Sequence, residues 1–237
     1  MFLRHLGVSQ LVIGRHAYSV ANHALKRDLE GDETHIEKLR HMHTSQVKLA
    51  PDGVRQSVRK GQFLREIGMT HFDAYYTSSY ARTKETAQLM SLPGAHWLHD
   101  HRLDERDWGK FNFITEREKL QLDPDWEARF HSDPLHWRPH GGQTRAEKNQ
   151  IASAFLHDIT HRHARKKVII VGHYETNLGL QMCIEHITPV QYIALRDSLD
   201  MENATLIEYR ENDSGTLEKR RINPHKRVVS SWIQIHR

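Results

Sequence analysis

Short apolar runs along the chain alternate with longer segments in which apolar residues recur at helical spacing. The clearest runs are rich in β-branched and aromatic residues: QLVIGR at 10–15, FDAYYT at 72–77 and KKVIIVG at 166–172. Runs of this length predict buried strands. The spacing within 51–67 and 145–163 predicts helices, the second of them capped by Thr144. Strands and helices that alternate in this way predict an α/β fold with a mostly parallel central sheet and helices on both faces.

Weaker patterns predict the remaining elements. Further helices are expected at 19–29, 78–89 and 175–186, and further strands near 97, 190–196, 203–210 and 227–235. Two polar segments near 23–47 and 106–145 lack a clear apolar stripe, so we expect them to be insertions, the second lying over one end of the sheet. Because no repeat, low-complexity tract or linker divides the chain, we expect a single domain over residues 1–237.

The composition narrows the class of ligand and the compartment. The chain has 34 basic and 30 acidic residues spread along its length, together with 20 histidines. This mild basic excess suits a small anionic substrate and gives no sign of nucleic-acid binding. Cys183 is the single cysteine, no apolar run is long enough to span a membrane, and the N-terminus lacks the apolar stretch of a signal peptide. We therefore expect a cytoplasmic protein that binds neither nucleic acid nor membrane.

Two of the buried strands end in histidine. His16 follows the first strand within Arg15-His16, and His173 follows the strand at 166–172. The carboxyl ends of parallel strands form the ligand crevice of α/β sheets, where the free N–H groups of the following helices favour an anion. Arg82, about one turn into its helix, can bring a planar guanidinium to the same crevice. Glu105 or the adjacent Asp104 offers a carboxyl group for proton transfer.

Other histidines are less informative. His41 and His43 form one local pair and His161 and His163 another, both in polar segments. Neither pair has a cysteine partner or the helical spacing of a zinc motif. We interpret them as surface residues and expect neither a metal nor another cofactor.

Four tryptophans, Trp97, Trp108, Trp126 and Trp137, are spread widely along the chain. An aromatic platform for bases or sugars is one interpretation, and amphipathic packing is the more common role for such a spread. Trp108 is close in sequence to Glu105, so we expect it at the rim of the pocket.

Taken together, five segments resemble the histidine phosphatase superfamily, in its phosphoglycerate-mutase-like branch. They occur in the family's order from about residue 10 to about residue 210: Arg15-His16, LAPDGVRQ at 49–56, TSSYARTKETA at 77–87, LDE at 103–105 with Gly109, and VGH at 171–173. Each segment alone is unspecific, and their joint order carries the resemblance.

The resemblance implies a three-layer α/β/α sandwich and a covalent phosphohistidine on His16. It further implies a phosphate pocket formed by Arg15, Arg82 and His173, with Glu105 as the proton donor and no metal. Asn22 matches a position that often contacts the transferred phosphate. In the hypothesis that follows, a protonated His173 helps the two arginines to bind a small phosphorylated substrate, whose phosphomonoester is hydrolysed.

Departures from the family pattern affect the rim of the pocket rather than the residues implied in catalysis and phosphate binding. Ala17 and Tyr18 follow the first histidine, Tyr174 follows the second, and Gly-Gln-Thr at 142–144 replaces Gly-Glu-Ser, so the substrate is left open. A phosphoglycerate mutase-type phosphotransferase is an alternative, although Glu116 stands where mutases carry lysine and no Arg-Arg pair occurs between 110 and 150. A catalytically inactive domain that binds a phosphorylated ligand is another alternative. The sequence also leaves open a homodimer.

Overall fold

Four parallel strands form one half of the central sheet, and two of them lead directly to His16 and His173. The computed structural model describes residues 5–195 and 201–235, and in this part of the chain the sheet has eight strands. Its parallel half has the order β3-β2-β4-β1, with strands β1 (Gln10–Arg15), β2 (Ala74–Thr77), β3 (Trp97–His99) and β4 (Lys167–Gly172). All four carboxyl ends therefore lie along one edge.

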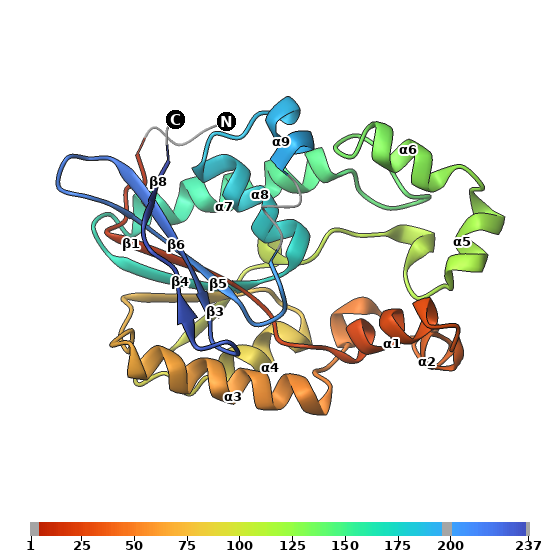
Figure 1. Cartoon of the computed structure of the whole chain (residues 1–237), viewed down its shortest axis with the longest axis horizontal. Coiled ribbons are helices and arrows are strands. Elements are labelled where there is room, and N and C mark those ends of the chain that lie inside the picture. The colour runs from red at the N-terminus through yellow and green to blue at the C-terminus, as the bar shows by residue number, and fades with distance from the viewer. Residues whose placement is uncertain (1–4, 196–200, 236–237) are drawn as a thin grey trace.

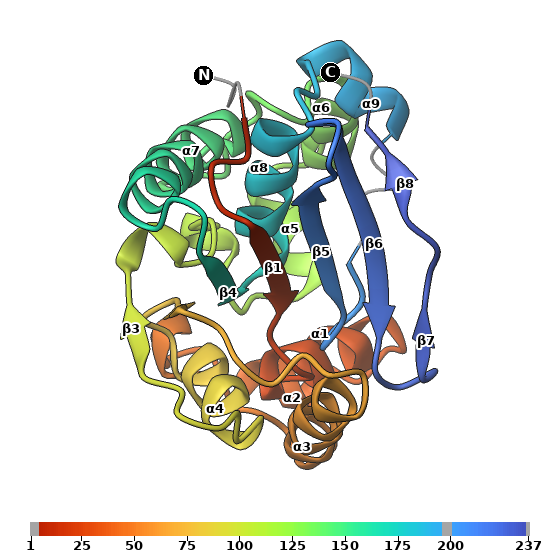
Figure 2. The ribbon, with the colours of Figure 1, turned by 90° about the vertical axis from the view of Figure 1, so that its left-hand side faces the viewer.

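The other half of the sheet is antiparallel and continues from β1. Its strands are β5 (Leu206–Glu211), β6 (Leu217–Asn223), β7 (Val228–Val229) and β8 (Ile233–Gln234). β5 pairs with β1, β6 pairs with β5, and the short β7 and β8 both pair with β6. Figure 2 shows these strands beside β1 and β4. The predicted parallel sheet is thus found in the half where the candidate histidines lie.

Helices cover both faces of the sheet. α7 (Arg145–Arg162) and α8 (Tyr174–Ile184) lie on one face, and α3 (Pro51–Glu66) and α4 (Ala81–Leu89) lie on the other (Figure 1). Successive residues of β1 point to opposite faces, so Leu11 and Ile13 pack toward α7 while Val12 packs toward α3. The alternation fills two apolar cores, and it confirms the three-layer α/β/α fold.

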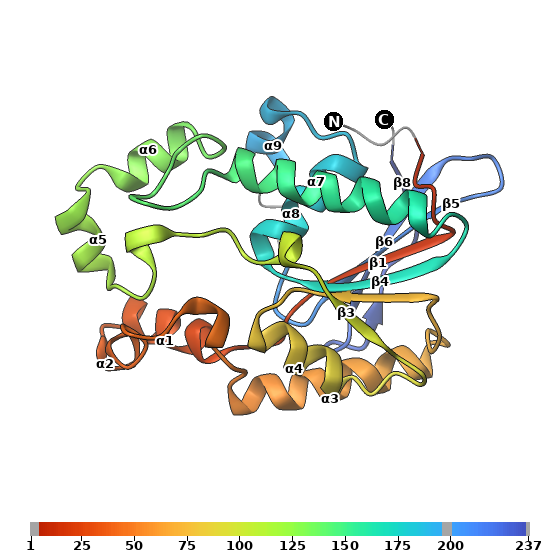
Figure 3. The ribbon, with the colours of Figure 1, turned by 180° about the vertical axis from the view of Figure 1, so that it is seen from behind.

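The two polar insertions fold together beyond the carboxyl ends of the parallel strands (Figure 3). Their elements are α1 (Val20–Leu29), which begins just before the first insertion, α2 (Thr34–Glu37), η1 (Thr44–Gln46), η3 (Gly109–Phe111), α5 (Glu116–Leu122) and α6 (Trp126–Ser132). The short η2 (His101–Leu103) precedes the second insertion. Ion pairs of 2.7 Å join Arg40 to Glu118 and Arg117 to Glu33 across the two segments. We call residues 23–47 and 106–145 together the cap. Because these contacts are between the insertions, the cap is a joint structure rather than two separate loops.

The sequence prediction was wrong in the region after α8. Residues 190–196 were expected to form a strand, whereas Pro189–Leu195 forms helix α9, with proline at its first position, where helices tolerate it. β6 was not predicted, because charged residues fill most of LEKRRIN and only Leu217 and Ile222 are buried. The expected strand at 227–235 is two short strands, β7 and β8.

Within the described ranges, no helix combines the length and apolarity that a bilayer crossing requires.

Small residues form much of the inner face of α3. Val54 and Val58, which lie at apolar spacing, are 41% and 38% exposed, while Gly53 and Gly61 are buried. At Gly53 the helix meets the loop that follows β1, and a Cβ there would lie 1.9 Å from the Tyr18 carbonyl oxygen. Ala50 N–H also donates to that oxygen at 3.0 Å. The close approach thereby fixes the loop against α3.

We expect Gly53→Ala to destabilise the protein by about 1–3 kcal/mol, because the new methyl group meets backbone that cannot rotate away. Urea unfolding of Gly53→Ala beside the control Val54→Ala, at the exposed next position, measures this effect. The control is expected to stay within about 0.5 kcal/mol of wild type. Equal stability of the two variants would contradict the close packing.

Candidate active site

His16 directly follows β1, at the carboxyl edge of the parallel strands. Its backbone N–H donates to the Gly172 carbonyl at 2.9 Å and so continues the pairing of β1 with β4. The side chain is only 3% exposed, and its Nδ1 lies 2.7 Å from the Ala17 carbonyl oxygen. Because a carbonyl oxygen only accepts hydrogen bonds, Nδ1 carries the proton and Nε2 keeps its lone pair.

The free nitrogen of His16 faces a cation. Arg82 Nε–H donates to His16 Nε2 at 3.3 Å. Burial, and then the charges of Arg82 and Arg15, hold the pKa of His16 well below its usual value of 6.5. The ring is therefore neutral near pH 7, and Nε2 is available as a nucleophile.

His173 lies beside His16 because Arg15 and Gly172 are partners in the β1–β4 register. The two ring centroids are 5.1 Å apart. His173 Nε2 lies 2.8 Å from Ser78 Oγ, and Ser78 Oγ–H donates to Asp104 at 2.9 Å. Since the only proton of Ser78 Oγ goes to the carboxylate, His173 Nε2 is the donor in the other bond.

The surroundings of His173 favour a neutral ring in the absence of phosphate, and the protonation expected with a bound phosphate stays a prediction. Burial lowers its pKa well below 6.5, and the charges of Arg82 and His16 lower it further. Its Nδ1 is buried and has no hydrogen-bond partner among the described residues. A ligand that brings negative charge to Nδ1 would favour the protonated form.

Two arginines flank the pair of histidines. Arg82 is 6% exposed, and its Nη1 donates to the Thr44 carbonyl in the cap at 2.8 Å. Arg15 Nη1 donates to the Met201 carbonyl at 2.7 Å, and its guanidinium carbon lies 5.3 Å from the centre of the Tyr174 ring. Both guanidinium groups therefore lie at the carboxyl edge of the sheet, where neutral carbonyls accept their hydrogen bonds.

Asn22 supports the loop that follows His16. Its Oδ1 accepts hydrogen bonds from Ser19 N at 3.1 Å and Ser19 Oγ at 2.9 Å, within a capping box at the start of α1. Asn203 Nδ2 also donates to Asn22 Oδ1 at 3.2 Å and to the His16 carbonyl at 3.1 Å. These bonds occupy the amide oxygen, so the predicted phosphate contact falls to the amide nitrogen and stays a prediction.

Of the two candidate carboxyl groups, Glu105 fits the proton donor. Asp104 accepts hydrogen bonds from Ser78 and Ser79 and is held as a structural group. Within the part of the chain that the structure describes, Glu105 Oε1 accepts only the backbone N–H groups of Arg106 at 3.0 Å and Glu175 at 3.2 Å. Burial and the neighbouring Glu175 carboxylate raise the pKa of Glu105, as a proton donor requires.

The tryptophans of the cap pack against one another. Trp108, Trp126 and Trp137 form a cluster with Phe111 and Phe130, with ring centroids 5.5–6.3 Å apart. The Arg106 guanidinium carbon lies 4.0 Å from the centre of the Trp108 ring. Packing is thus the role that the contacts support, and a place for Trp108 at the pocket rim stays a prediction.

The histidine pairs have local partners. His161 Nδ1 lies 2.6 Å from the His157 carbonyl, and His43 Nδ1 lies 2.7 Å from Ser45 Oγ. Within residues 5–195 and 201–235, no three histidine, cysteine, aspartate or glutamate side chains come together as metal ligands.

Comparison with known families adds independent information to this geometry. The model of the histidine phosphatase superfamily (branch 1) matches residues 31–223, most of the chain. The chain belongs to the histidine phosphatase superfamily. The matched range includes Arg82, Glu105 and His173, whereas Arg15 and His16 precede it. Their assignment rests on the β1–β4 register and on the contacts described above.

Relatives of this chain include enzymes of two kinds. A 2,3-bisphosphoglycerate-dependent phosphoglycerate mutase from Azorhizobium caulinodans is 28% identical over 154 residues, which are 60% of this chain and 71% of the relative. Phosphoserine phosphatase 1 from Hydrogenobacter thermophilus is 24% identical over 127 residues, which are 53% of this chain and 60% of the relative.

A solved structure shares the fold at low sequence identity. The mycobacterial glucosyl-3-phosphoglycerate phosphatase has a TM-score of 0.69 and 18% identity, and the alignment covers 95% of this chain and 96% of that one. At this identity the likeness concerns the fold alone.

Several residues of this candidate site could not be identified from the sequence. Ser78 was taken only as a helix cap, yet it orients His173. Glu175 is 3% exposed and receives hydrogen bonds from the guanidinium of Arg145, while Arg106 lies 3.4 Å from it. No local motif marks these roles, because the partners come from separate elements.

Lys60 was also missed, because one lysine in a helix carries no signal. It is fully buried, and its Nζ donates to the Arg15 carbonyl at 3.1 Å, directly beneath the histidine site. Burial lowers its pKa from 10.5 to about 7. A protonated Lys60 adds to the positive potential at His16, at a cost in stability.

We expect Lys60→Met to be more stable than wild type at and below pH 7, by on the order of 2 kcal/mol, because it removes a buried charge. Between pH 7 and 10 the unfolded wild-type chain holds a proton that the folded protein has lost, so wild-type stability rises with pH. The advantage of the variant therefore shrinks toward pH 10. Denaturant unfolding across this range measures it.

The exposed Lys48→Met serves as the control and is expected to show no such pH-dependent difference. A constant gap between Lys60→Met and wild type from pH 6 to pH 10 would contradict the depressed pKa.

Proposed function

We propose that this chain is a phosphatase that hydrolyses a small phosphomonoester through a phosphohistidine on His16. The observation that carries the proposal is the state of His16: a buried, neutral imidazole with Nδ1 tied to a carbonyl and Nε2 facing Arg82. An anion drawn to the guanidinium would bring its phosphorus close to the lone pair. Membership of the superfamily supports the same conclusion.

Substrate binding exchanges existing hydrogen bonds for bonds to phosphate. Arg82 and Arg15 now donate to the neutral carbonyls of Thr44 and Met201. Phosphate oxygens carry full charge and make stronger, charge-assisted bonds to guanidinium groups. As the dianion enters, it favours protonation of His173 at Nδ1, which adds a third donor. The site thus gains positive charge next to the equatorial phosphoryl oxygens, which carry the negative charge of the transition state.

The chemistry then runs in two steps. His16 Nε2 attacks phosphorus, the ester P–O bond breaks, and the leaving oxygen takes its electron pair and the proton of Glu105. In the second step water attacks the phosphohistidine, the P–N bond breaks, and Glu105 recovers a proton from the water. Inorganic phosphate is released and His16 returns to its neutral state.

The arginines around Glu175 favour the phosphatase over the mutase. A mutase has to hold a second anionic group on its substrate. Arg106 and Arg145 are two buried arginines that face Glu175, whose backbone N–H donates to Glu105. Both are already paired with Glu175, and each is under 5% exposed. Glu116, in the position where mutases carry lysine, forms an ion pair with Lys119. Arg106 and Arg145 are therefore already occupied by Glu175 and do not form a pair that is available to a second anionic group of the substrate.

The remaining expectations about the chain keep the status of predictions. They are a single domain with the two insertions, a cytoplasmic location, the absence of a nucleic-acid partner and the option of a homodimer. None of them is needed for the proposed reaction.

We expect His16→Ala to lose at least about 10³-fold in turnover of a phosphomonoester and all covalent labelling, because the nucleophile is gone. Acid-labile ³²P incorporation from a slow substrate and release of inorganic phosphate measure the two effects. The exposed His140→Gln is the matched control and should behave as wild type.

The same assay on a phosphoglycerate separates the two enzyme types. Release of phosphate without isomerised product supports the phosphatase, and isomerised product as the main outcome would establish the mutase instead. Undiminished hydrolysis by His16→Ala would refute the nucleophile.

We expect Glu105→Gln to slow phosphorylation of His16 by about 10²-fold or more with an alkyl ester, and by less than tenfold with 4-nitrophenyl phosphate. An alkoxide needs a proton to leave and 4-nitrophenolate does not. Rapid-quench measurement of the phosphoenzyme burst isolates this step. With the alkyl ester, the wild-type rate should fall as pH rises through the raised pKa of Glu105, and the variant should lose this alkaline limb.

Glu127→Gln, which removes an exposed carboxylate in the cap, is the control. An equal loss with both leaving groups would exclude Glu105 as the general acid.

A further inference from the structure

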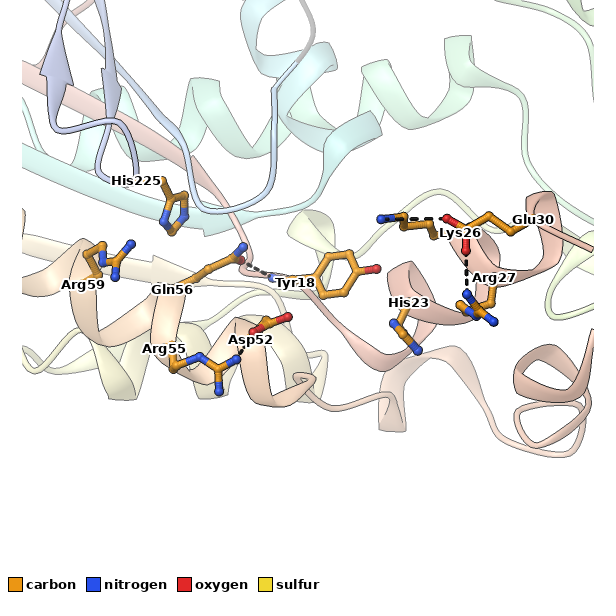
Figure 4. Close-up of a pocket in the computed structure, with 10 residues that line it drawn as sticks. All are labelled: Tyr18, His23, Lys26, Arg27, Glu30, Asp52, Arg55, Gln56, Arg59 and His225. Carbon is orange, nitrogen blue, oxygen red and sulfur yellow. Dashed lines mark hydrogen bonds and ion pairs between the residues drawn. The ribbon is translucent and has the colours of Figure 1, made fainter. Parts of the chain in front are cut away.

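A pocket separate from the histidine site lies between α1, α3 and the turn before β7 (Figure 4). Its volume is about 560 Å³, and it is lined by Tyr18, His23, Lys26, Arg27, Glu30, Asp52, Arg55, Gln56, Arg59 and His225. None of the five proposed phosphate-binding or nucleophilic groups, Arg15, His16, Asn22, Arg82 and His173, is among these residues. The size is within the range that holds a small organic ligand.

The lining of the pocket carries an excess of positive charge. Four of its ten residues are lysine or arginine and two are acidic. Asp52 pairs with Arg55, and Glu30 pairs with Arg27 at 2.7 Å and with Lys26 at 3.9 Å, which uses both carboxylates within the lining. For Arg59, the described residues provide neither a hydrogen bond nor an ion pair. The lining therefore keeps a net positive charge, and Arg59 is a cation that its carboxylates do not neutralise.

The cationic groups lie at two ends of the pocket. Figure 4 shows Arg59 and His225 at one end and His23, Lys26 and Arg27 at the other, with Tyr18 and Gln56 between them. His225 Nε2 is buried without a hydrogen-bond partner among the described residues. Such a nitrogen gains from a polar ligand, because an unpaired buried polar group is costly.

We propose that this pocket is an accessory binding site for a small organic molecule with two anionic groups, each a phosphate or a carboxylate. One anionic group binds at Arg59 and His225, and the other binds at Lys26 and His23. Arginine offers a planar fork to the first and lysine a point charge to the second. The polar or ring-containing middle of the ligand lies against Tyr18 and Gln56.

The pocket shares a loop with the candidate active site. Tyr18 N–H donates to Gln56 Oε1 at 2.8 Å, and Tyr18 is two residues beyond His16. A ligand between Tyr18 and Gln56 therefore touches the segment that follows the nucleophile. This site does not depend on the reaction proposed for His16, because its lining residues take no part in that reaction.

Isothermal titration with propane-1,3-diphosphonate tests the proposal, because its P–C bonds resist a phosphatase. At 150 mM salt, which screens weak surface attraction, we expect wild type to bind two molecules, one in each site. Arg59→Gln should weaken the pocket site at least tenfold and leave phosphatase activity in place. Arg82→Gln should weaken the other site instead. Lys26→Gln, at the opposite end, is a second pocket variant with the same expected loss as Arg59→Gln.

Arg165→Gln is the matched control, since it removes one exposed positive charge just before β4, at the opposite edge of the sheet. Two molecules bound with wild-type affinity in both Arg59→Gln and Lys26→Gln would overturn the proposal. A single molecule bound to wild type and lost in Arg82→Gln would overturn it as well. If purified wild type shows no phosphatase activity, only the proposed function is contradicted, because the titration does not depend on turnover.

Discussion

The parallel pairing of β1 with β4 is the constraint on which the rest of the site depends. Its register sets Arg15 opposite Gly172. The next residues, His16 and His173, therefore lie side by side just beyond the ends of the two strands. A slip of one residue would turn His16 or His173 to the other face of the sheet. The register is fixed in turn by the apolar side chains of both strands, which fill two different cores. Core packing therefore sets the distance between two rings that carry the proposed chemistry.

Burial then decides the charge of those rings. His16, His173, Arg82 and Lys60 are each under 10% exposed. Burial is the main cause that lowers the pKa of both imidazoles, and the charge of Arg82 lowers it further. A cluster of buried donors without an anion is unfavourable for the free protein. The same arrangement is favourable once a dianion is present, because each donor then gains a charged acceptor. A bound phosphoryl group thus offsets the unfavourable burial of these donors in the free protein.

The sequence predicted those parts of the site in which each residue is fixed by its own strand or helix. Arg15, His16 and His173 follow apolar runs, and Arg82 follows a recognisable turn, so their shared edge could be deduced. The contacts of Ser78, Lys60 and Asn203 could not, because each joins elements far apart in the chain. The same reason explains β6, whose few buried residues are recognisable only beside β5. The depth at which His173 is buried, which lowers its pKa in the free protein, could not be predicted either, because burial is a tertiary property.

The cap connects this chemistry to the choice of substrate. Thr44 comes from the first insertion, and its carbonyl holds the Arg82 Nη1 that a phosphate oxygen would take. Ion pairs tie that insertion to the second one, so movement at Thr44 is coupled to α5 through Arg40 and Glu118. A substrate must therefore both displace the Thr44 carbonyl and fit beneath the joined insertions. Of the departures from the family pattern, Gly-Gln-Thr at 142–144 lies in the cap, whereas Ala17, Tyr18 and Tyr174 adjoin the two histidines. Under the proposed function, selectivity therefore follows from the cap and from these neighbours of the histidines, and reactivity follows from the sheet beneath them.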